Sequence, residues 1–210
     1  EAVCSNFEGA RGEYIRRMLS ASCRYGQGGS IADLWAVKIS ELFTHVVADT
    51  RTPDGYLTIP GLFSWANTIA FGKTVGATPN GRKAGEPINH GANPNPGFRR
   101  DGAFSAMGAA IASVQPGRGN TAPWQLELDL TMVDNEEAVK NIAAVIDTHF
   151  EQGGTLININ IVDGEKLRAA YKDPQRYPDL VVRVTGFTAY FSTLSPEFRK
   201  MIVDRVITDE

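Results

Sequence analysis

The run TLININIV at residues 155–162 is the feature that most narrows what this chain can fold into. Isoleucines alternate with Asn158 and Asn160, which is the two-residue period of a β-strand with two different faces. Asparagine is uncommon in strands. Two asparagines on one face therefore indicate either a polar interior, such as a barrel lumen or the wall of a site, or an edge strand that faces solvent.

Helix and strand patterns alternate around this run. Asn135 can cap a helix, and Ser195 followed by Pro196 can begin another. The predicted elements are a strand at 126–132, a helix at 136–150, the strand at 155–162, a helix at 164–172, a buried strand at 180–184 and a terminal helix from 196. Alternation of this kind is typical of an α/β fold.

The first 50 residues predict two helices, at 7–24 and 31–48, because their apolar residues recur at helical spacing. Ser30 is a suitable N-cap for the second helix. That helix is mostly apolar, so we expect it to be well buried.

The middle of the chain follows a different pattern. Residues 56–71 are rich in aromatic and β-branched side chains, which predicts one or two buried strands interrupted at Pro60 and Gly61. Glycine, proline and asparagine crowd residues 72–102, which predicts a long loop, and residues 103–114 are compatible with a helix.

Composition excludes several classes of protein. Of the 210 residues, 42% are hydrophobic and 21% charged, as in an ordinary globular domain, and the net charge of −3 argues against nucleic-acid binding. No run approaches the ~18 apolar residues of a membrane span. Two cysteines, Cys4 and Cys23, cannot form a disulfide framework, so we expect a reducing, cytoplasmic location. The chain opens at Glu1 without an initiator Met, so we expect a piece of a longer protein.

Common catalytic motifs are missing from the sequence. His45, His90 and His149 lie far apart and have no zinc-binding spacing, so we expect no metal site. Residues 26–30, GQGGS, could bind an anion ahead of a helix, but they lack the lysine of a phosphate-binding loop. A turn between helices is the favoured interpretation. No GxSxG motif for a serine nucleophile occurs.

One glycine near the C-terminus stands among strongly β-forming neighbours, in the pentapeptide Arg183-Val184-Thr185-Gly186-Phe187. On spacing alone, Gly186 is most simply a tight bend after a strand. The pentapeptide, however, resembles the fingerprint of glycyl radical enzymes, Arg-Val-any-Gly-Tyr/Phe. Further segments resemble the same family in the same order: residues 71–73, 76–87, 160–180 and 194–197. The resemblance therefore covers nearly the whole chain.

The resemblance implies a fold and a chemistry. It implies the C-terminal part of an α/β barrel, with the glycine loop inserted at the barrel centre and a radical stored on Gly186. A separate radical S-adenosylmethionine iron–sulfur activating enzyme would install that radical, and no cofactor would be bound by this chain. Arg183 and Val184 match the motif linked to activase recognition, and Phe187 replaces the more frequent tyrosine. Glycine suits the role because a planar Cα radical has no room for a Cβ.

The resemblance also indicates what this chain lacks. The family's substrate-attacking cysteine lies farther upstream, and neither Cys4 nor Cys23 matches it.

From the resemblance we expect residues 1–85 to complete a barrel domain and residues 86–210 to form the glycine radical domain. The expected partners are the rest of the parent chain, the activating enzyme, a small organic substrate, and further copies or small subunits in a dimer or larger assembly. Nucleic acid and membrane are not expected partners, and the fragment alone should be inactive.

The subgroup is suggested by three middle segments, residues 59–67, 90–94 and 112–123. They look most like the fumarate-adding benzylsuccinate and alkylsuccinate synthases, which join a hydrocarbon radical to fumarate. In that interpretation Ser64 and Ala66 line the substrate pocket. The alternatives are a pyruvate formate-lyase-type acyltransferase, a dehydratase or decarboxylase of the same family, a glycyl-radical repair module, and an inert α/β domain in which Gly186 is only a turn.

Overall fold

The structure is a computed structural model that describes residues 1–64, 67–95, 104–115, 122–184 and 186–206. Its centre is a parallel pair of strands, β1 (Pro123–Asp129) and β2 (Leu156–Val162). They are joined through α5 (Glu136–Glu151), which is the connection that parallel strands require. The α/β prediction is confirmed as a mixed α/β arrangement, in which the described strands form two separate two-stranded sheets.

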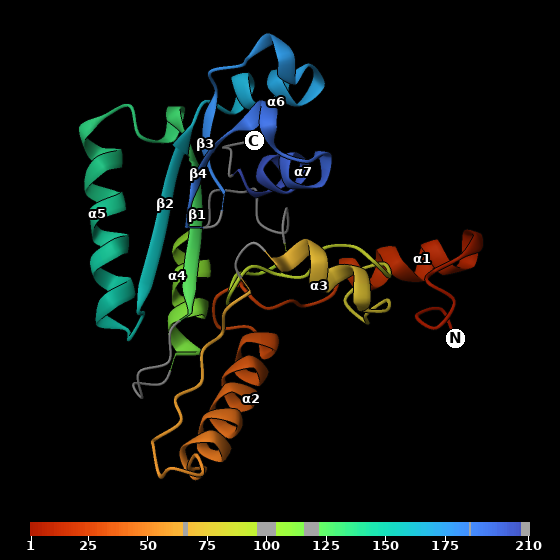
Figure 1. Ribbon diagram of the computed structural model, residues 1–210, viewed down its shortest axis with the longest axis vertical. Coiled ribbons are helices and arrows are strands. Elements are labelled where there is room, and N and C mark those ends of the chain that lie inside the picture. Colours follow the sequence, from red (N-terminus) through yellow and green to blue (C-terminus); the bar gives the residue numbers. More distant parts are fainter. Residues whose placement is uncertain (65–66, 96–103, 116–121, 185, 207–210) are drawn as a thin grey trace.

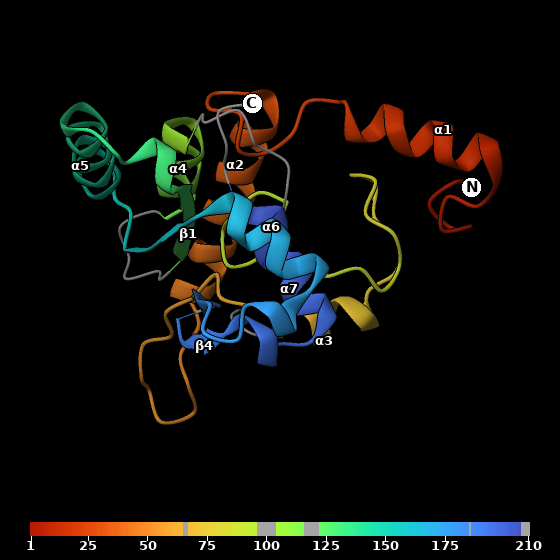
Figure 2. The same cartoon turned by 90° about the horizontal axis from the view of Figure 1, so that it is seen from above.

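The register of β1 and β2 gives the pair one apolar and one polar face. Trp124 lies opposite Ile157 and Leu126 opposite Ile159 on the apolar face. That face packs against α5 and α4 (Phe104–Ser113), which lie on the same side of the strands (Figures 1 and 2). On the other face Gln125 pairs with Asn158, and Glu127 with Asn160.

The polar face looks toward the C-terminal part of the chain. There β3 (Val181–Arg183) and β4 (Thr188–Tyr190) form an antiparallel hairpin beside α6 (Gly164–Lys172) and α7 (Pro196–Arg205) (Figure 1). Short 3₁₀ turns at Leu130–Met132, Pro174–Arg176 and Phe191–Thr193 link these elements. A second apolar cluster holds the hairpin to the helices; its buried members include Leu167, Val182, Phe191 and Ile202.

Local capping signals position several helices as predicted. The Ser30 and Asp33 side chains form a capping box at the start of α2 (Ile31–Ala48). Asn135 accepts a hydrogen bond from the Ala138 amide, and Ser195 accepts one from the Phe198 amide. Residues 26–30 form a turn, as the favoured interpretation held, because Asp33 accepts hydrogen bonds from the Gly26 and Ser30 amides (2.7 and 2.9 Å).

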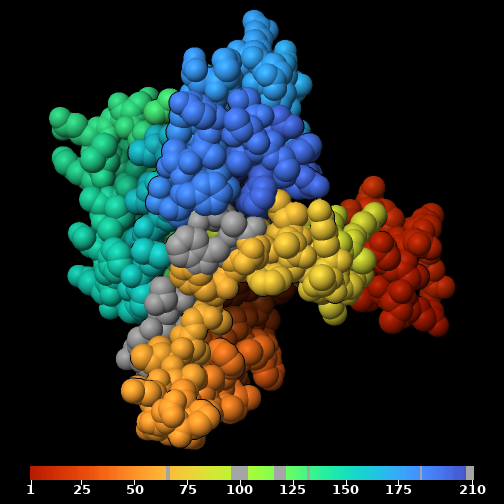
Figure 3. Space-filling view, viewed as in Figure 1, coloured from red at the N-terminus to blue at the C-terminus, as the bar shows by residue number. Residues whose placement is uncertain are grey.

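The prediction that the second helix is well buried is wrong. Its apolar side chains face outward, with Trp35 58% and Leu42 67% exposed, while the polar Ser40 and Thr44 are buried. The helix projects from the rest of the molecule together with the loop that follows it (Figure 3). The Ser40 hydroxyl explains the orientation in part, since it donates to the Val114 carbonyl (2.6 Å).

The strands predicted at 56–71 are also absent from the described residues of that segment. Tyr56 is 71% exposed, Leu57 makes one isolated bridge to Arg51, and the segment ends in α3 (Thr68–Thr74). Pro60 offers no amide for a strand ladder. Single hydrogen bonds hold the segment instead, such as those of the Ser64 hydroxyl to the segment around residue 90 and that from the Ile88 amide to the Thr68 carbonyl.

The remaining elements differ from prediction mainly at their ends. The first helix, α1, spans Gly9–Ser20, and β1 begins at Pro123 and ends at Asp129, short of the predicted 132. The strand predicted at 180–184 is shorter, and its partner β4 was not foreseen. In the part of the chain that the structure describes, no helix combines the length and hydropathy needed to cross a bilayer.

Candidate active site at the glycine hairpin

The turn between β3 and β4 places a glycine at its tip. Gly186 has a φ of +88°, in the left-handed region that side-chain-bearing residues rarely adopt. The Val184 amide donates to the Phe187 carbonyl (2.8 Å) across the turn. Val184 is fully buried, whereas Gly186 and Phe187 are exposed. The fold therefore anchors the hairpin before the glycine and leaves the glycine itself accessible.

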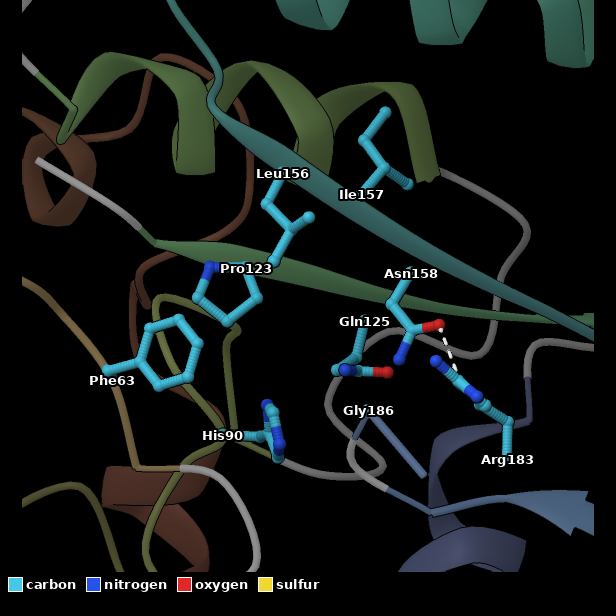
Figure 4. A pocket seen from close by; sticks show the side chains of 9 residues that line it. All are labelled: Phe63, His90, Pro123, Gln125, Leu156, Ile157, Asn158, Arg183 and Gly186. Carbon is cyan, nitrogen blue, oxygen red and sulfur yellow. Dashed lines mark hydrogen bonds between the residues drawn. The ribbon is translucent and has the colours of Figure 1, made fainter. Parts of the chain in front are cut away.

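Gly186 lines a cavity of about 220 Å³ between the hairpin and the β1–β2 pair. Phe63, Pro123, Leu156 and Ile157 contribute apolar atoms to its wall, and His90, Gln125, Asn158 and Arg183 contribute polar ones. In Figure 4, Gln125 and Asn158 extend from adjacent strands toward the side where Gly186 lies, with His90 across from them. The polar face of the central strands thus borders the cavity at Gln125 and Asn158, which favours the polar-interior interpretation for Asn158, whereas Asn160 does not line the cavity.

Three of the polar groups in this wall have unused hydrogen-bonding capacity. Within the described chain, neither ring nitrogen of His90, nor Gln125 Oε1, nor Asn158 Nδ2 has a hydrogen-bond partner, although all are buried. A buried polar group without a partner costs free energy. Together they present unused hydrogen-bonding groups to whatever occupies this cavity.

The electrostatics of the cavity favour a neutral imidazole. His90 is only 3% exposed, and burial lowers its pKa to about 4, with the Arg205 guanidinium acting in the same direction. Arg183 brings a positive charge to the hairpin side. Its Nε donates to Asn158 Oδ1 (3.4 Å), drawn in Figure 4, and its Nη1 donates to Thr188 Oγ1 (3.2 Å). At neutral pH, Arg183 is therefore the cation among the described residues that line the cavity.

The structure brings some predicted site residues together and separates others. Gly186 and Arg183 line the cavity, while Val184 and Phe187 flank them in the hairpin. Ser64 does not line this cavity. Its hydroxyl donates to the Asn89 carbonyl (2.6 Å) and accepts from the Gly91 amide (2.8 Å), so it holds the segment that carries His90. Ala66 lies outside the described residues.

His90 and Gln125 were not predicted as site residues. Gln125 had a detectable signal, because WQLELD at 124–129 alternates polar and apolar residues as TLININIV does. Pairing the two polar faces would have placed Gln125 beside Asn158. No comparable pattern marks His90, which reaches the cavity only through the path of the loop. No group of three or more His, Cys, Asp or Glu within the described ranges is arranged to hold a metal ion.

Comparison with known proteins places this geometry in a family. The family model described as "Glycine radical" matches residues 88–192, which include the whole hairpin and most of the cavity wall. The chain belongs to the glycyl radical family.

Known relatives align over nearly all of this chain. Isethionate sulfite-lyase of Oleidesulfovibrio alaskensis is 28% identical over 100% of the chain and 25% of its own length. Formate acetyltransferase 1 of Escherichia coli is 27% identical over 88% of the chain and 25% of its own length. The chain thus spans about a quarter of these relatives.

Solved structures extend the similarity to three dimensions. Hydroxyproline dehydratase from Clostridioides difficile, with trans-4-hydroxy-L-proline bound, superposes with a TM-score of 0.85 at 28% identity, over 98% of this chain and 26% of that one. A structure described for 1,2-propanediol dehydration in Roseburia inulinivorans gives a TM-score of 0.86 at 27% identity, over 99% and 27%. These names do not support the fumarate-adding subgroup that the middle segments suggested.

Proposed function

We propose that Gly186 stores the radical of a glycyl radical enzyme, of which this chain forms the C-terminal portion. The observation that carries the proposal is the position of Gly186, at an accessible hairpin tip on the edge of a cavity with both apolar and polar groups in its wall. A radical on its Cα is stabilised between an electron-donating amide nitrogen and an electron-accepting carbonyl when the centre is planar. The absence of a Cβ allows that flattening.

In the proposed sequence, each step transfers one hydrogen atom and leaves one radical. The activating enzyme removes one hydrogen atom from the Gly186 Cα and leaves a carbon radical. That radical takes a hydrogen atom from a cysteine thiol outside this chain, which restores the glycine and produces a thiyl radical. The thiyl radical takes a hydrogen atom from the substrate, and the product radical later takes one back.

We place the boundary of the glycine radical domain near residue 86, with residues 1–85 belonging to the barrel.

The exposed apolar face of α2 supports the view that more protein surrounds this chain. Ile31, Leu34, Trp35, Ile39, Leu42, Phe43 and Val46 are all about half exposed or more. Contiguous apolar surface of this kind marks an interaction site. We infer that the rest of a barrel covers it, since the relatives are about four times as long as the aligned region.

We infer that the reaction cleaves or eliminates a polar group from a small substrate. Hydrogen-bonding groups of His90, Gln125 and Asn158 would stay unpaired against a hydrocarbon. The names of the relatives, a sulfite-lyase, an acetyltransferase and dehydratases, favour the same class. Fumarate addition, which the middle segments suggested, becomes the alternative that a substrate screen must test.

The test uses the complete enzyme, activated without oxygen by its activating enzyme. We expect an electron paramagnetic resonance doublet from the single remaining α-hydrogen, followed in air by backbone cleavage at Gly186. Gly186→Ala should give neither result, whereas Gly76→Ala, whose added Cβ would meet nothing within 4 Å, should give both. A doublet that survives Gly186→Ala would contradict the proposal. The activated enzyme is then offered hydroxylated and sulfonated small molecules, and fumarate with hydrocarbons.

A further inference from the structure

The carbonyl of Val184, two residues before Gly186, is held by a distant arginine. Arg205 is the last residue of α7, and its Nη2 donates to the Val184 oxygen (3.0 Å). Its side chain is only 6% exposed. A cation at a helix C-terminus commonly interacts with the last carbonyls of its own helix. Here the acceptor lies on another element instead, at the base of the glycine turn.

A buried carboxylate forms an ion pair with this arginine, without a hydrogen bond between the two side chains. Glu127 on β1 is 1% exposed, and its Oε1 is 3.4 Å from Arg205 Nη2. A buried charge is tolerated when an opposite charge compensates it. Burial raises the pKa of Glu127, and Arg205 opposes that rise by stabilising the ionised carboxylate. Arg205 thereby connects β1, α7 and the hairpin through two contacts of a single nitrogen.

Apart from the apolar cluster, in which Val162 of β2 packs with Val182 and Val184, the described residues make few polar contacts between the hairpin and the strands behind it. β3 and β4 pair over only three residues each, and a short two-stranded ribbon is marginally stable by itself. The second polar tether is Arg183, whose bond to Asn158 is long at 3.4 Å. The Arg205 bond is shorter and is made by a buried charged donor, which is the stronger kind of hydrogen bond.

We propose that Arg205, held by Glu127, is a positioning residue that fixes the Gly186 turn against the cavity through the Val184 carbonyl. The inference about the turn stands on the contacts alone. Its consequence for turnover rests on the proposed radical function. A fixed turn keeps the Gly186 Cα at one distance from its reaction partner, and hydrogen-atom transfer is sensitive to misplacement on the ångström scale.

The experiment compares variants of the complete enzyme. The main variant is Arg205→Met combined with Glu127→Gln, which removes both charges and leaves neither buried alone. Arg205→Lys keeps a positively charged donor group at this position and should retain part of the wild-type protection and turnover. The matched control is Lys200→Met on the same helix, because its ion pair with Asp204 is exposed and contributes little.

The first measurement is amide hydrogen exchange, which does not depend on the radical. Losing a hydrogen bond from a charged donor should speed exchange in residues 181–190 by about 10- to 100-fold in the double variant. In the double variant, exchange in α5 should stay unchanged. In the Lys200→Met control, exchange in the hairpin should stay unchanged as well. Unchanged exchange in the hairpin, or equal acceleration in α5, would overturn the proposal, since the pair would then have no specific role at the turn.

The second measurement is turnover per spin of glycyl radical. We expect the double variant to lose at least about tenfold in turnover per spin, while Arg205→Lys falls between it and wild type. Full turnover per spin in the double variant would overturn the proposed effect on Gly186. If wild type forms no radical, the proposed function fails, and the exchange measurement still decides whether Arg205 holds the turn.

Discussion

At the scale of single residues, the site combines a glycine that needs no side chain with polar groups that have no hydrogen-bond partner among the described residues. Gly186 adopts a φ of +88° at the hairpin tip. His90, opposite it, is buried with both ring nitrogens unpaired in the described chain. Gly186 could be singled out from the sequence because its motif spans only a few neighbouring residues. His90 could not, because its burial depends on the fold.

The lowered pKa of His90 predicts a specific acid sensitivity. The unfolded chain takes up a proton near pH 6.5, while the folded protein holds His90 neutral until about pH 4. Stability is therefore unaffected above pH 6.5 and is lost as the pH falls from 6.5 to 4, by up to about 3 kcal/mol. His90→Gln should remove this loss.

The check is urea unfolding of both proteins between pH 8 and pH 4. The difference between wild type and His90→Gln should be constant from pH 8 to 7 and should then shift against wild type. Contributions from His149, whose pKa burial also lowers, and from Glu127, whose pKa burial raises, are present in both proteins. A difference that stays flat down to pH 4 would show that His90 titrates normally.

At the scale of elements, local signals and packing determined different things. Ser30, Asn135 and Ser195 cap the helices that their sequences predict, because an N-cap bond involves residues only a few positions apart. Residues 56–71 were predicted as strands from the same kind of local evidence, and that prediction is wrong. A β-forming segment becomes a strand only when a partner strand is available, and Leu57 finds one isolated bridge.

The contact between α3 and the segment that leads to His90 gives a prediction at this scale. A Cβ built on Gly72 would clash with the Glu86 carbonyl oxygen and would lie 2.7 Å from the Pro87 Cα. These are backbone atoms and cannot rotate away. Gly72→Ala should therefore destabilise the complete enzyme by about 1–3 kcal/mol, despite the better helix propensity of alanine.

Denaturant unfolding tests this close contact, with Gly76→Ala as the control because the space around Gly76 is open. Equal stability of the two variants would mean that α3 is not closely packed against residues 86–87. A further effect is expected on the cavity, since displacing this segment also displaces His90.

At the scale of the whole molecule, α2 is the part that the chain alone does not explain. Its apolar residues face solvent and its small polar residues face the protein, the reverse of an ordinary surface helix. The helix is well formed, as its capping box predicts, because capping is local, whereas burial of its apolar face depends on what packs against the helix. The proposed barrel would bury this face.

The prediction at this scale concerns Leu42, which is 67% exposed here. If the rest of the enzyme covers α2, Leu42→Asp should cost the complete enzyme about 2–5 kcal/mol by placing an unpaired charge in an apolar contact. Glu41→Asp introduces the same residue at the neighbouring polar position and should cost less than about 1 kcal/mol. Thermal unfolding of both variants measures the difference.

In the chain of 210 residues expressed alone, the two substitutions should have similar effects on stability, because the α2 face is open there. Leu42→Asp should in addition make the folded 210-residue chain more soluble. Equal effects of the two substitutions in the complete enzyme would indicate that α2 stays exposed and that the proposed covering is wrong.

The sequence by itself determined the local features of this protein: the capped helices, the alternating strands and the motif around Gly186. Each depends on hydrogen bonds or side-chain periods within a few residues, so neighbours along the chain suffice. The tertiary structure alone decided which face of β1 and β2 meets the hairpin, that His90 and Gln125 border Gly186, and that Arg205 holds the Val184 carbonyl. Those contacts join residues far apart in the chain, and they depend on how whole elements pack, which no local pattern encodes.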